Sequence, residues 1–328
     1  MRVAINGFGR IGRTILRQVL CDPVNADIEV ALINEIAPLG TCAYLFQYDS
    51  VFGPFPGAVS LQGDMLVAGD AEVRMTQADD LSTVDLGDID LVLECTGRAN
   101  SRDIAERGLR AGAGSVLISG PSAAAEVTLV LGANEELLGS QSVISNASCT
   151  TNALAPILRL IDDTLGIERG HMTTIHCYTG SQPMVDAPRA SLPRSRAGAV
   201  SMIPTTTSAT KLVGRVLPQL DGRISGAAVR VPAISVSAID LTLQLREQPG
   251  TAMNQFLSEA VKNRTMIGLT DDPVVSTDMR GRPESLIIAT PETMELDGGQ
   301  VRLFGWYDNE WGYSARVLDM ARLIHQRI

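Results

Sequence analysis

The chain has 328 residues and a formal net charge of −10 at pH 7, from 27 lysines and arginines against 37 aspartates and glutamates. This length allows two domains with sizeable cores. The negative charge and the lack of lysine or arginine tracts exclude nucleic acid as the main partner, and no apolar run approaches the roughly 18 to 20 residues of a membrane span.

The first predicted element is a strand that starts directly at Met1-Arg2-Val3-Ala4-Ile5 and leaves no room for a signal peptide. The five cysteines, at positions 21, 42, 95, 149 and 177, form an odd and scattered set without CxxC spacing. Such a set favours neither a disulfide framework nor a zinc site, so that no metal is expected. We therefore expect a reducing, cytoplasmic location.

The strand at residues 2–6 leads into Gly7-Phe8-Gly9-Arg10-Ile11-Gly12, and a helix with apolar spacing follows. In strand, G-x-G-x-x-G, helix, the first glycine permits the tight turn, the second lets the backbone approach a pyrophosphate, and the third permits close helix–strand packing. A second strand at 28–33 is followed by Glu35, which is placed to bind the adenosine ribose hydroxyls and to repel a 2'-phosphate. This pattern favours NAD over NADP, although Glu35 could instead be a solvated loop residue.

Hairpin-like pieces at 57–67 and 71–75 come next, and then two buried strands at 89–95 and 115–121 with a helix at 104–110 between them. Both strands end in small polar residues, as expected at the carboxyl edge of a doubly wound sheet, where a cofactor binds. Thr96, Gly97 and Ser119 are therefore candidate cofactor contacts, with ordinary loop chemistry as the alternative.

The stretch Ser145-Asn146-Ala147-Ser148-Cys149-Thr150-Thr151-Asn152 lies between a short strand at 141–144 and a predicted helix. A cysteine in the first turn of a helix meets unpaired backbone N–H groups and the positive dipole end, which favour the thiolate. His176 lies on the next strand-like run, 173–178, where it could meet Cys149. A cysteine and a distant histidine are the minimum for covalent catalysis. A lone buried cysteine is the alternative, but the polar cluster around Cys149 disfavours it.

The second half is dominated by strand-like runs at 170–178, 224–231 and 234–245, with few helices (209–217 and 252–261). This pattern predicts a mixed or antiparallel sheet with helices on one face. Between 178 and 208 runs a loop rich in Pro, Gly, Arg and Ser, and its Arg189, Arg194 and Arg196 favour either anion binding or surface solvation. The chain ends in a strand and turn at 301–313 and an amphipathic helix at 315–328.

These features resemble the phosphorylating glyceraldehyde-3-phosphate dehydrogenase family over essentially the whole chain. The matching segments are Ile5 to Arg13, Ser145 to Asn152, Thr174-Ile175-His176, Arg230-Val231-Pro232 and Tyr307 to Tyr313. The resemblance implies an α/β protein with an N-terminal, doubly wound Rossmann NAD domain at 1–147, onto which the helix 315–328 packs back. It also implies an α+β catalytic domain with a mixed sheet at 148–314, and a homotetramer.

The resemblance also implies a role for individual residues. Cys149 would attack the aldehyde to give a thiohemiacetal and then a thioester that phosphate cleaves, with His176 as base and acid. Thr179 and Arg230 would hold the phosphate of the aldehyde substrate. Inorganic phosphate would be held by Ser148, Thr150, Arg194, Thr207 and Ser208. NAD would be held by Gly7, Gly9, Arg10, Ile11, Glu35, Gln77, Thr96, Ser119 and Asn309.

Two alternatives stay open at this stage. Glu35, where the family usually has Asp, and the stretch Ile239-Asp240-Leu241 resemble the erythrose-4-phosphate dehydrogenase branch. A non-catalytic NAD-binding thiol sensor would use the same cysteine without turnover. The suitability of the site for two phosphates favours the glyceraldehyde 3-phosphate enzyme.

Overall fold

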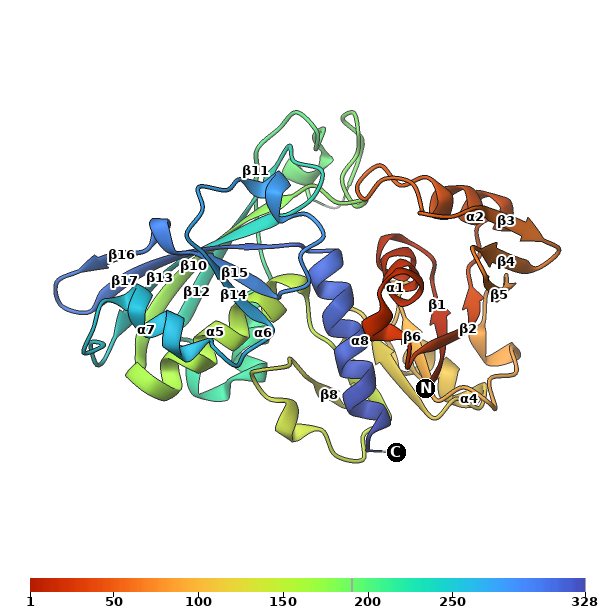
Figure 1. Ribbon diagram of the computed structural model, residues 1–328, viewed down its shortest axis with the longest axis horizontal. Coiled ribbons are helices and arrows are strands. Elements are labelled where there is room, and N and C mark those ends of the chain that lie inside the picture. The colour runs from red at the N-terminus through yellow and green to blue at the C-terminus, as the bar shows by residue number, and fades with distance from the viewer. Residues whose placement is uncertain (190, 328) are drawn as a thin grey trace. The chain divides into compact units, whose positions relative to one another are not determined.

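The computed structural model describes residues 1–189 and 191–327, which fold into two compact units (Figure 1). The first unit consists of Met1–Leu129, Glu136–Ser148 and the chain from Ser314 onward. The second consists of Val130–Glu135 and Cys149–Tyr313. Across the described residues, no helix combines the length and the apolar character that crossing a membrane requires.

The first unit is built on one nine-stranded sheet. Its strands are β1 (Arg2–Asn6), β2 (Glu29–Asn34), β3 (Val59–Gln62), β4 (Met65–Ala68), β5 (Ala71–Thr76), β6 (Leu91–Glu94), β7 (Ser115–Ile118), β8 (Val127–Thr128) and β9 (Val143–Ser145). They lie in the order β3-β4-β5-β2-β1-β6-β7-β9-β8. All neighbours from β5 to β8 are parallel, and β3 and β4 add an antiparallel edge.

The central strands are apolar on both faces because helices accompany a parallel sheet. The helices of this unit are α1 (Arg10–Cys21), α2 (Leu39–Gln47), α3 (Arg102–Ala105), α4 (Arg107–Arg110) and, from Ser314, α8 (Trp311–His325). The strand order reverses between β1 and β6, which are parallel neighbours. At such a reversal the chain leaves the sheet in opposite directions, so a crevice opens at the carboxyl ends of the strands.

The second unit is built on a mixed sheet. Its strands are β10 (Ile167–Cys177), β11 (Ile203–Thr205), β12 (Ile224–Val231), β13 (Ser237–Leu245), β14 (Ile267–Thr270), β15 (Leu286–Ala289), β16 (Met294–Leu296) and β17 (Gln300–Tyr307). They lie in the order β11-β12-β10-β13-β17-β15-β14, with β16 beside β17. β10 is parallel to β12 and antiparallel to β13, so that the mixed sheet expected from the sequence is confirmed.

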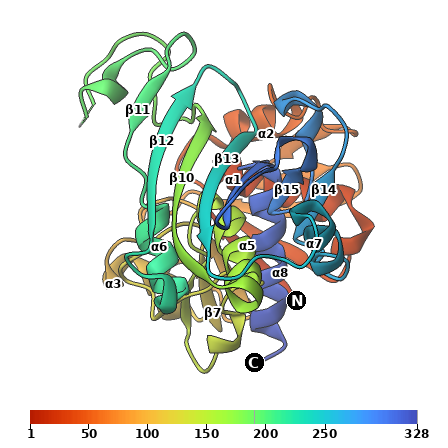
Figure 2. The same ribbon diagram turned by 90° about the vertical axis from the view of Figure 1, so that its left-hand side faces the viewer.

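Three helices belong to the second unit: α5 (Cys149–Leu165), α6 (Ala209–Val216) and α7 (Met253–Ala260). The apolar residues of α5 recur at helical spacing, and they are buried where α5 packs against β10, β13 and β15. Figure 2 shows α6 beside α5 and against β12. This packing fixes the start of α5 over the end of β10.

Three elements differ from the sequence-based expectation. The single helix expected at 104–110 is two short helices that meet at Glu106, and Gly108 touches the sheet so closely that a Cβ there would lie 2.8 Å from Val92 Cγ2. The strand expected from residue 234 begins at Ser237, because Val236 has a φ of 65°, which no strand accommodates.

The last helix begins earlier than the expected residue 315. The Asp308 carboxylate accepts the N–H groups of Glu310 and Trp311 at 3.0 and 2.9 Å, which starts α8 at Trp311. Arg322 of α8 forms a two-pronged pair with the Asp27 carboxylate, at 2.8 and 2.9 Å. The final residue of the predicted range, Ile328, lies outside the described residues.

Candidate active site

Cys149 and His176 meet in the second unit. Cys149 is the first residue of α5, and His176 is the penultimate residue of β10. Because α5 packs against β10, the Cys149 Sγ lies 3.7 Å from the His176 Nε2. The imidazole is buried and the cysteine is half-buried. The structure thus brings together the two side chains that the sequence predicts as a catalytic pair.

Tyr307 connects the two elements that carry Cys149 and His176. The sequence analysis assigned no role to this residue. Its hydroxyl lies 2.9 Å from the Oγ1 of Thr150 on α5 and 2.9 Å from the Oγ1 of Thr174 on β10. Its ring meets the His176 ring edge-on, with centroids 6.1 Å apart. A buried tyrosine normally has a partner for its hydroxyl, and here that requirement joins β17 to the start of α5. A tyrosine at the buried end of a strand whose alternate residues are buried was the available signal.

Arg230 stands on the other side of the imidazole. It is the register partner of His176 in the parallel pair β10–β12, so both side chains leave the sheet on the same face. The Arg230 Nη1 lies 2.6 Å from the His176 Nδ1 and 2.9 Å from the Cys177 carbonyl oxygen. The same carbonyl oxygen lies 2.7 Å from the His176 Nδ1.

Loss of water dominates the electrostatics of the pair. Burial raises the pKa of the Cys149 thiol, outweighing hydrogen bonds with Thr150 and the charge of Arg230, which both lower it. Burial and then the charge of Arg230 lower the pKa of His176 from 6.5 to about 4. The helix start and Arg230 favour the charged form of the thiol, whereas desolvation opposes it. The Cys149 thiolate therefore stays a prediction.

The second cysteine of this region is held in a non-reactive form. The buried Cys177 thiol donates to the Asn309 Oδ1 at 3.1 Å, and the Ser237 hydroxyl donates to the same oxygen at 3.3 Å. Burial raises the pKa of Cys177 to about 12. Since the thiolate is the nucleophile, Cys149 is the reactive thiol of the pair, and Cys177 fixes the orientation of the Asn309 amide.

The candidate anion-binding residues lie on two segments of the chain, one following β10 and one leading into α6. Thr179 follows β10, and its hydroxyl lies 2.9 Å from the Ser181 hydroxyl. Burial lowers the pKa of Arg230, and the positive charge of Arg194 lowers it further, so the two guanidinium groups feel each other. Two neighbouring cations with hydroxyl groups nearby form a setting that an anion stabilises.

Arg194 is anchored on the segment that leads into α6. Its Nε donates to the Thr205 Oγ1 at 2.8 Å and its Nη2 to the Thr206 carbonyl at 3.3 Å. Thr207 accepts the Ala209 N–H at 3.1 Å, and Ser208 precedes α6 without capping it through its side chain. Ser148 lies directly before Cys149 and is half-buried. The structure therefore joins Arg194 to the residues just before Thr207.

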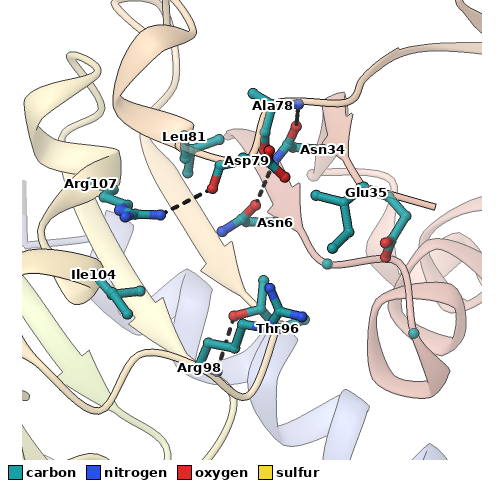
Figure 3. A pocket seen from close by; sticks show the side chains of 14 residues that line it. Asn6, Asn34, Glu35, Ala78, Asp79, Leu81, Thr96, Arg98, Ile104 and Arg107 are labelled. Carbon is teal, nitrogen blue, oxygen red and sulfur yellow. Dashed lines mark hydrogen bonds between the residues drawn. The ribbon is translucent and has the colours of Figure 1, made fainter.

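A pocket of about 290 Å³ lies in the first unit, at the carboxyl ends of β1, β2 and β6 (Figure 3). It is lined by Asn6, Gly7, Gly9, Asn34, Glu35, Ile36, Ala78, Asp79, Leu81, Cys95, Thr96, Arg98, Ile104 and Arg107. It includes the candidate cofactor residues Gly7, Gly9, Glu35 and Thr96. Its place at the reversal of strand order is where doubly wound sheets bind nucleotides.

The three glycines of the first turn have the different roles that the motif predicts. Gly7 has a φ of 96°, and a Cβ there would lie 2.8 Å from the Cys95 carbonyl carbon. A Cβ on Gly12 would lie 2.2 Å from the Gly7 carbonyl oxygen, whereas a Cβ on Gly9 would meet nothing within 4 Å. Gly7 and Gly12 are thus required by the fold itself, and Gly9 faces open space into which a pyrophosphate fits.

Glu35 ties the end of β2 to this turn. Its Oε2 accepts the Phe8 N–H at 2.7 Å, and its Oε1 accepts the Ala37 N–H at 3.0 Å. Each carboxylate oxygen can accept a further bond, so that a ribose hydroxyl can still be bound. Glu35 therefore also holds the glycine turn against the end of β2, a structural role that its sequence position did not reveal.

The other candidate cofactor residues lie outside the lining of this pocket. Arg10 pairs with Asp49 at 2.5 Å and stands over the Phe52 ring. Ile11 follows it in the first turn of α1, and exposed Gln77 donates to the Ala37 carbonyl at 3.0 Å. Ser119 follows β7 directly, and Asn309 belongs to the second unit.

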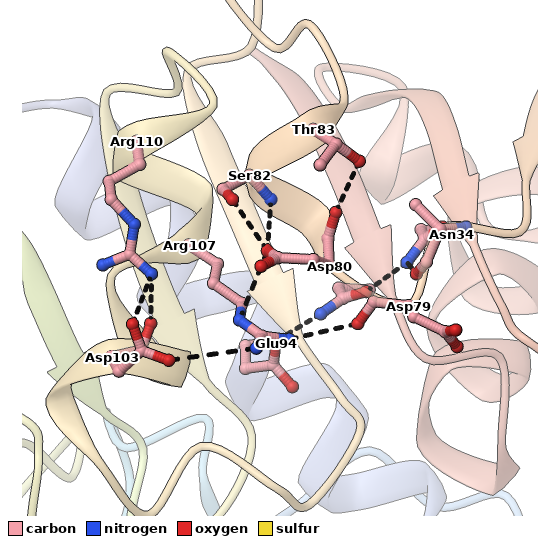
Figure 4. A network of polar contacts seen from close by, with 11 residues as sticks. Asn34, Asp79, Asp80, Ser82, Thr83, Glu94, Asp103, Arg107 and Arg110 are labelled. Carbon is pink, nitrogen blue, oxygen red and sulfur yellow. Dashed lines mark hydrogen bonds and ion pairs between the residues drawn. The ribbon is translucent and has the colours of Figure 1, made fainter.

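A polar network supports the pocket and was missed by sequence reasoning. The Asn6 Nδ2 donates to the buried Glu94 carboxylate at 2.5 Å, and the Asn34 Nδ2 donates to the Asn6 Oδ1 at 2.9 Å. Arg107 reaches the Asp79 carbonyl at 3.1 Å and the Asp80 carboxylate at 3.3 Å (Figure 4). The available signal was that β1, β2 and β6 all end in a residue with a polar or charged side chain.

Two family models match the chain. The model described as glyceraldehyde 3-phosphate dehydrogenase, NAD binding domain, matches residues 1–102, and that described as glyceraldehyde 3-phosphate dehydrogenase, C-terminal domain, matches residues 148–309. The chain belongs to the glyceraldehyde-3-phosphate dehydrogenase family. A member of this family is an NAD-dependent oxidoreductase that acts on an aldehyde, and NAD is its cofactor.

Curated relatives named glyceraldehyde-3-phosphate dehydrogenase match nearly the whole chain. The protein of Xanthobacter flavus is 45% identical over 330 residues, covering 98% of this chain and 97% of the relative. That of Pseudomonas aeruginosa is 46% identical, with the same coverage, and that of Geobacillus stearothermophilus is 42% identical, covering 99% and 98%. The predicted Rossmann and catalytic domains of a glyceraldehyde-3-phosphate dehydrogenase family member are thereby confirmed.

NAD fits the residues of this family member. The Gly7 turn, the open space at Gly9 and the Glu35 carboxylate provide the turn, the backbone approach and the ribose acceptor that a dinucleotide needs. Within residues 1–189 and 191–327, no group of three or more His, Cys, Asp or Glu side chains is arranged to hold a metal ion.

Proposed function

We propose that the chain catalyses the phosphorylating oxidation of D-glyceraldehyde 3-phosphate to 1,3-bisphosphoglycerate with NAD. The carrying observation is the 3.7 Å approach of the Cys149 Sγ to the His176 Nε2, beside Arg230. In this proposal residues 1–147 with the helix 315–328 hold NAD, and residues 148–314 carry the catalytic site. The enzyme works in the cytoplasm as a homotetramer.

Cys149 and His176 perform the first half of the reaction. The Cys149 sulfur attacks the aldehyde carbon, and its proton passes to the His176 Nε2. The aldehyde oxygen becomes the thiohemiacetal oxygen, which the Cys149 backbone N–H and His176 stabilise. NAD, when bound, supplies the acceptor for the hydride that leaves this carbon. The imidazolium first returns its proton to the thiohemiacetal oxygen, and His176 takes the same proton back as the hydride leaves, so that a thioester is left on Cys149.

Inorganic phosphate completes the reaction. A phosphate oxygen attacks the thioester carbon, the Cys149 sulfur leaves as the thiolate, and the product is an acyl phosphate. Arg230 and Thr179 hold the substrate's own phosphate in this scheme. Ser148, Thr150, Arg194, Thr207 and Ser208 hold the attacking phosphate. The support for two separate anion sites is that Arg194 and Arg230 are anchored on different segments, Arg194 by Thr205 and Thr206 and Arg230 by the Cys177 carbonyl.

The erythrose 4-phosphate alternative gains no support from the fold. The stretch Ile239-Asp240-Leu241 lies within β13, and the Asp240 carboxylate forms a two-pronged pair with Arg302, at 2.9 Å for each contact. This explains Asp240 as a cross-strand partner. The thiol-sensor alternative has no use for Arg194 and Arg230.

The test is NADH formation with D-glyceraldehyde 3-phosphate in the presence and absence of phosphate or arsenate. We expect turnover that depends on the oxyanion, and a kcat/KM above that for erythrose 4-phosphate. Cys149→Ser is expected to abolish turnover and keep NAD binding, while Cys21→Ser, which changes an exposed thiol, serves as the matched control. Equal NAD reduction without phosphate or arsenate would contradict the proposal.

A further inference from the structure

A buried carboxylate contacts two of the residues that line the cofactor pocket of the first unit. Glu94 is the last residue of β6 and is 3% exposed (Figure 4). Its Oε2 accepts the Asn6 Nδ2–H at 2.5 Å. Its Oε1 accepts the backbone N–H of Thr96 at 2.9 Å and also the Thr96 hydroxyl. Across residues 1–189 and 191–327, no cationic side chain forms an ion pair with Glu94.

Every contact of the Glu94 carboxylate is with a donor. The backbone N–H of Thr96 can only donate, and the Asn6 nitrogen donates as well. A carboxylate accepts through both of its oxygens, whereas a glutamine amide carries two hydrogens at one end. A glutamine at this position would direct its NH2 group at the N–H of either Asn6 or Thr96. The position therefore requires an acceptor at both ends of the side chain, and length alone is not sufficient.

The Asn6 amide cannot turn over to relieve such a conflict, because Asn34 fixes it from the other side. The Asn34 Nδ2 donates to the Ala78 carbonyl at 3.0 Å, and the Asn34 Oδ1 accepts the Ala78 N–H at 2.8 Å. These backbone groups specify the orientation of the Asn34 amide, whose Nδ2 also donates to the Asn6 Oδ1 at 2.9 Å. Asn6 thus directs its oxygen at Asn34 (Figure 3) and its nitrogen at Glu94.

The Asn6 amide has capacity left for a ligand. An amide has two N–H hydrogens and two lone pairs, and the bonds with Glu94 and Asn34 use one of each. No other hydrogen bond of this side chain is found among the described residues. Asn6 is 8% exposed and lines the pocket. Since side-chain polar groups as buried as this one normally have partners, its remaining N–H indicates an acceptor in the pocket.

We propose that Glu94 is a positioning residue of the NAD pocket, whose carboxylate fixes the Asn6 amide so that one N–H of Asn6 donates to an oxygen atom of the dinucleotide. The same carboxylate engages the hydroxyl of Thr96, whose oxygen also accepts the Arg98 N–H at 3.1 Å. Thr96 therefore holds the turn after β6, and its hydroxyl hydrogen is not available to the cofactor. This inference goes beyond the proposed function, because it concerns NAD binding and requires no turnover.

The first variant, Glu94→Gln, tests the need for an acceptor. It keeps the length and shape of the side chain but directs an NH2 group at the N–H of Asn6 or of Thr96. We expect the Kd for NAD, measured by calorimetry on the full-length protein, to rise about tenfold, because Asn6 loses its fixed orientation. The melting temperature should fall by about 5 °C, since buried donors are left without an acceptor.

The second variant adds Asn6→Asp to Glu94→Gln, which exchanges the two functional groups and keeps the net charge. The glutamine carbonyl then accepts both groups of Thr96, the glutamine NH2 donates to the aspartate, and the aspartate accepts the Asn34 Nδ2–H. Every contact of the chain is satisfied again, so the melting temperature should return to within about 2 °C of the wild type. The N–H that faces the pocket is replaced by a carboxylate oxygen, so the Kd for NAD should stay at least about tenfold above the wild-type value.

Glu126 provides the matched control in the same unit. Its carboxylate accepts the N–H groups of Ser142 and Val143 at 2.7 and 3.0 Å, and it does not line the cofactor pocket. Glu126→Gln directs an NH2 group at backbone N–H groups, as Glu94→Gln does. It should lower the melting temperature and leave the Kd for NAD within about twofold of the wild type.

Three outcomes would overturn the inference. Wild-type affinity for NAD in Glu94→Gln would remove the positioning role, and so would an equal loss of affinity in Glu126→Gln, because affinity would then follow stability alone. Recovery of both affinity and stability in the double variant would show that the Asn6 N–H does not bind NAD. If Glu94→Gln does not fold, the double variant decides: we expect it to fold with weak NAD binding, and a double variant that also fails to fold would refute the hydrogen-bond chain. Loss or retention of glyceraldehyde 3-phosphate oxidation tests the proposed function separately.

Discussion

Replacing Tyr307 with phenylalanine removes one buried hydroxyl that joins three elements of the site. That hydroxyl bonds Thr150 and Thr174 at 2.9 Å each, and Thr174 keeps a second bond to the Ala238 carbonyl at 3.2 Å. A neutral hydrogen bond contributes about 1 kcal/mol and a buried group left without its partner costs about 1–3 kcal/mol. We expect Tyr307→Phe to lower the free energy of unfolding by about 2 kcal/mol.

The same change should reach catalysis, because Thr150 follows Cys149 in the first turn of α5. A small displacement of a reacting group costs one to two orders of magnitude in rate, so we expect kcat to fall about tenfold. Guanidinium unfolding and NADH formation measure the two effects. Tyr44→Phe is the matched control, because Tyr44 is 60% exposed and its change should stay within about 0.5 kcal/mol. Wild-type stability and kcat in Tyr307→Phe would refute the bridging role.

Three further predictions concern the cofactor pocket and the histidine. Gly9→Ala should leave the unfolding free energy within about 0.5 kcal/mol, since its methyl group meets no protein atom within 4 Å, yet weaken NAD binding about tenfold or more; calorimetry showing wild-type affinity would contradict this. Glu35→Ala should relax the preference for NAD over NADP, and an unchanged ratio of kcat/KM values would mean that Glu35 does not bind the ribose. The pKa of His176 is lowered from 6.5 to about 4, so the unfolded chain binds this proton first and stability falls as the pH drops through that interval, by roughly 3 kcal/mol in total. His176→Gln should remove this loss in urea unfolding while exposed His171→Gln keeps it, and parallel pH profiles for all three proteins would disprove the assignment.

Apolar periodicity and short motifs in the sequence predicted much of the fold. The apolar run of β1, the glycine turn and the amphipathic α1 specify one another within about twenty residues, and the structure has them where the sequence predicts. The predictions failed at two helix boundaries. The helix expected at 104–110 is interrupted at Glu106, before the turn in which Gly108 meets Val92 and Val116. Helix α8 begins early because the Asp308 carboxylate accepts the N–H groups of Glu310 and Trp311.

The sequence by itself determined the family, the mixed and doubly wound sheets, and the identity of the residue types available for chemistry, because periodicity and motif spacing are properties of the chain. It also singled out Cys149 and His176 as candidates. Only the tertiary structure brought them together, since the 3.7 Å approach of the two side chains and the contact of Arg230 with the His176 Nδ1 depend on packing between β10, β12 and α5. A helix start favours a thiolate in water, whereas burial opposes it, and burial is set by residues far away along the chain.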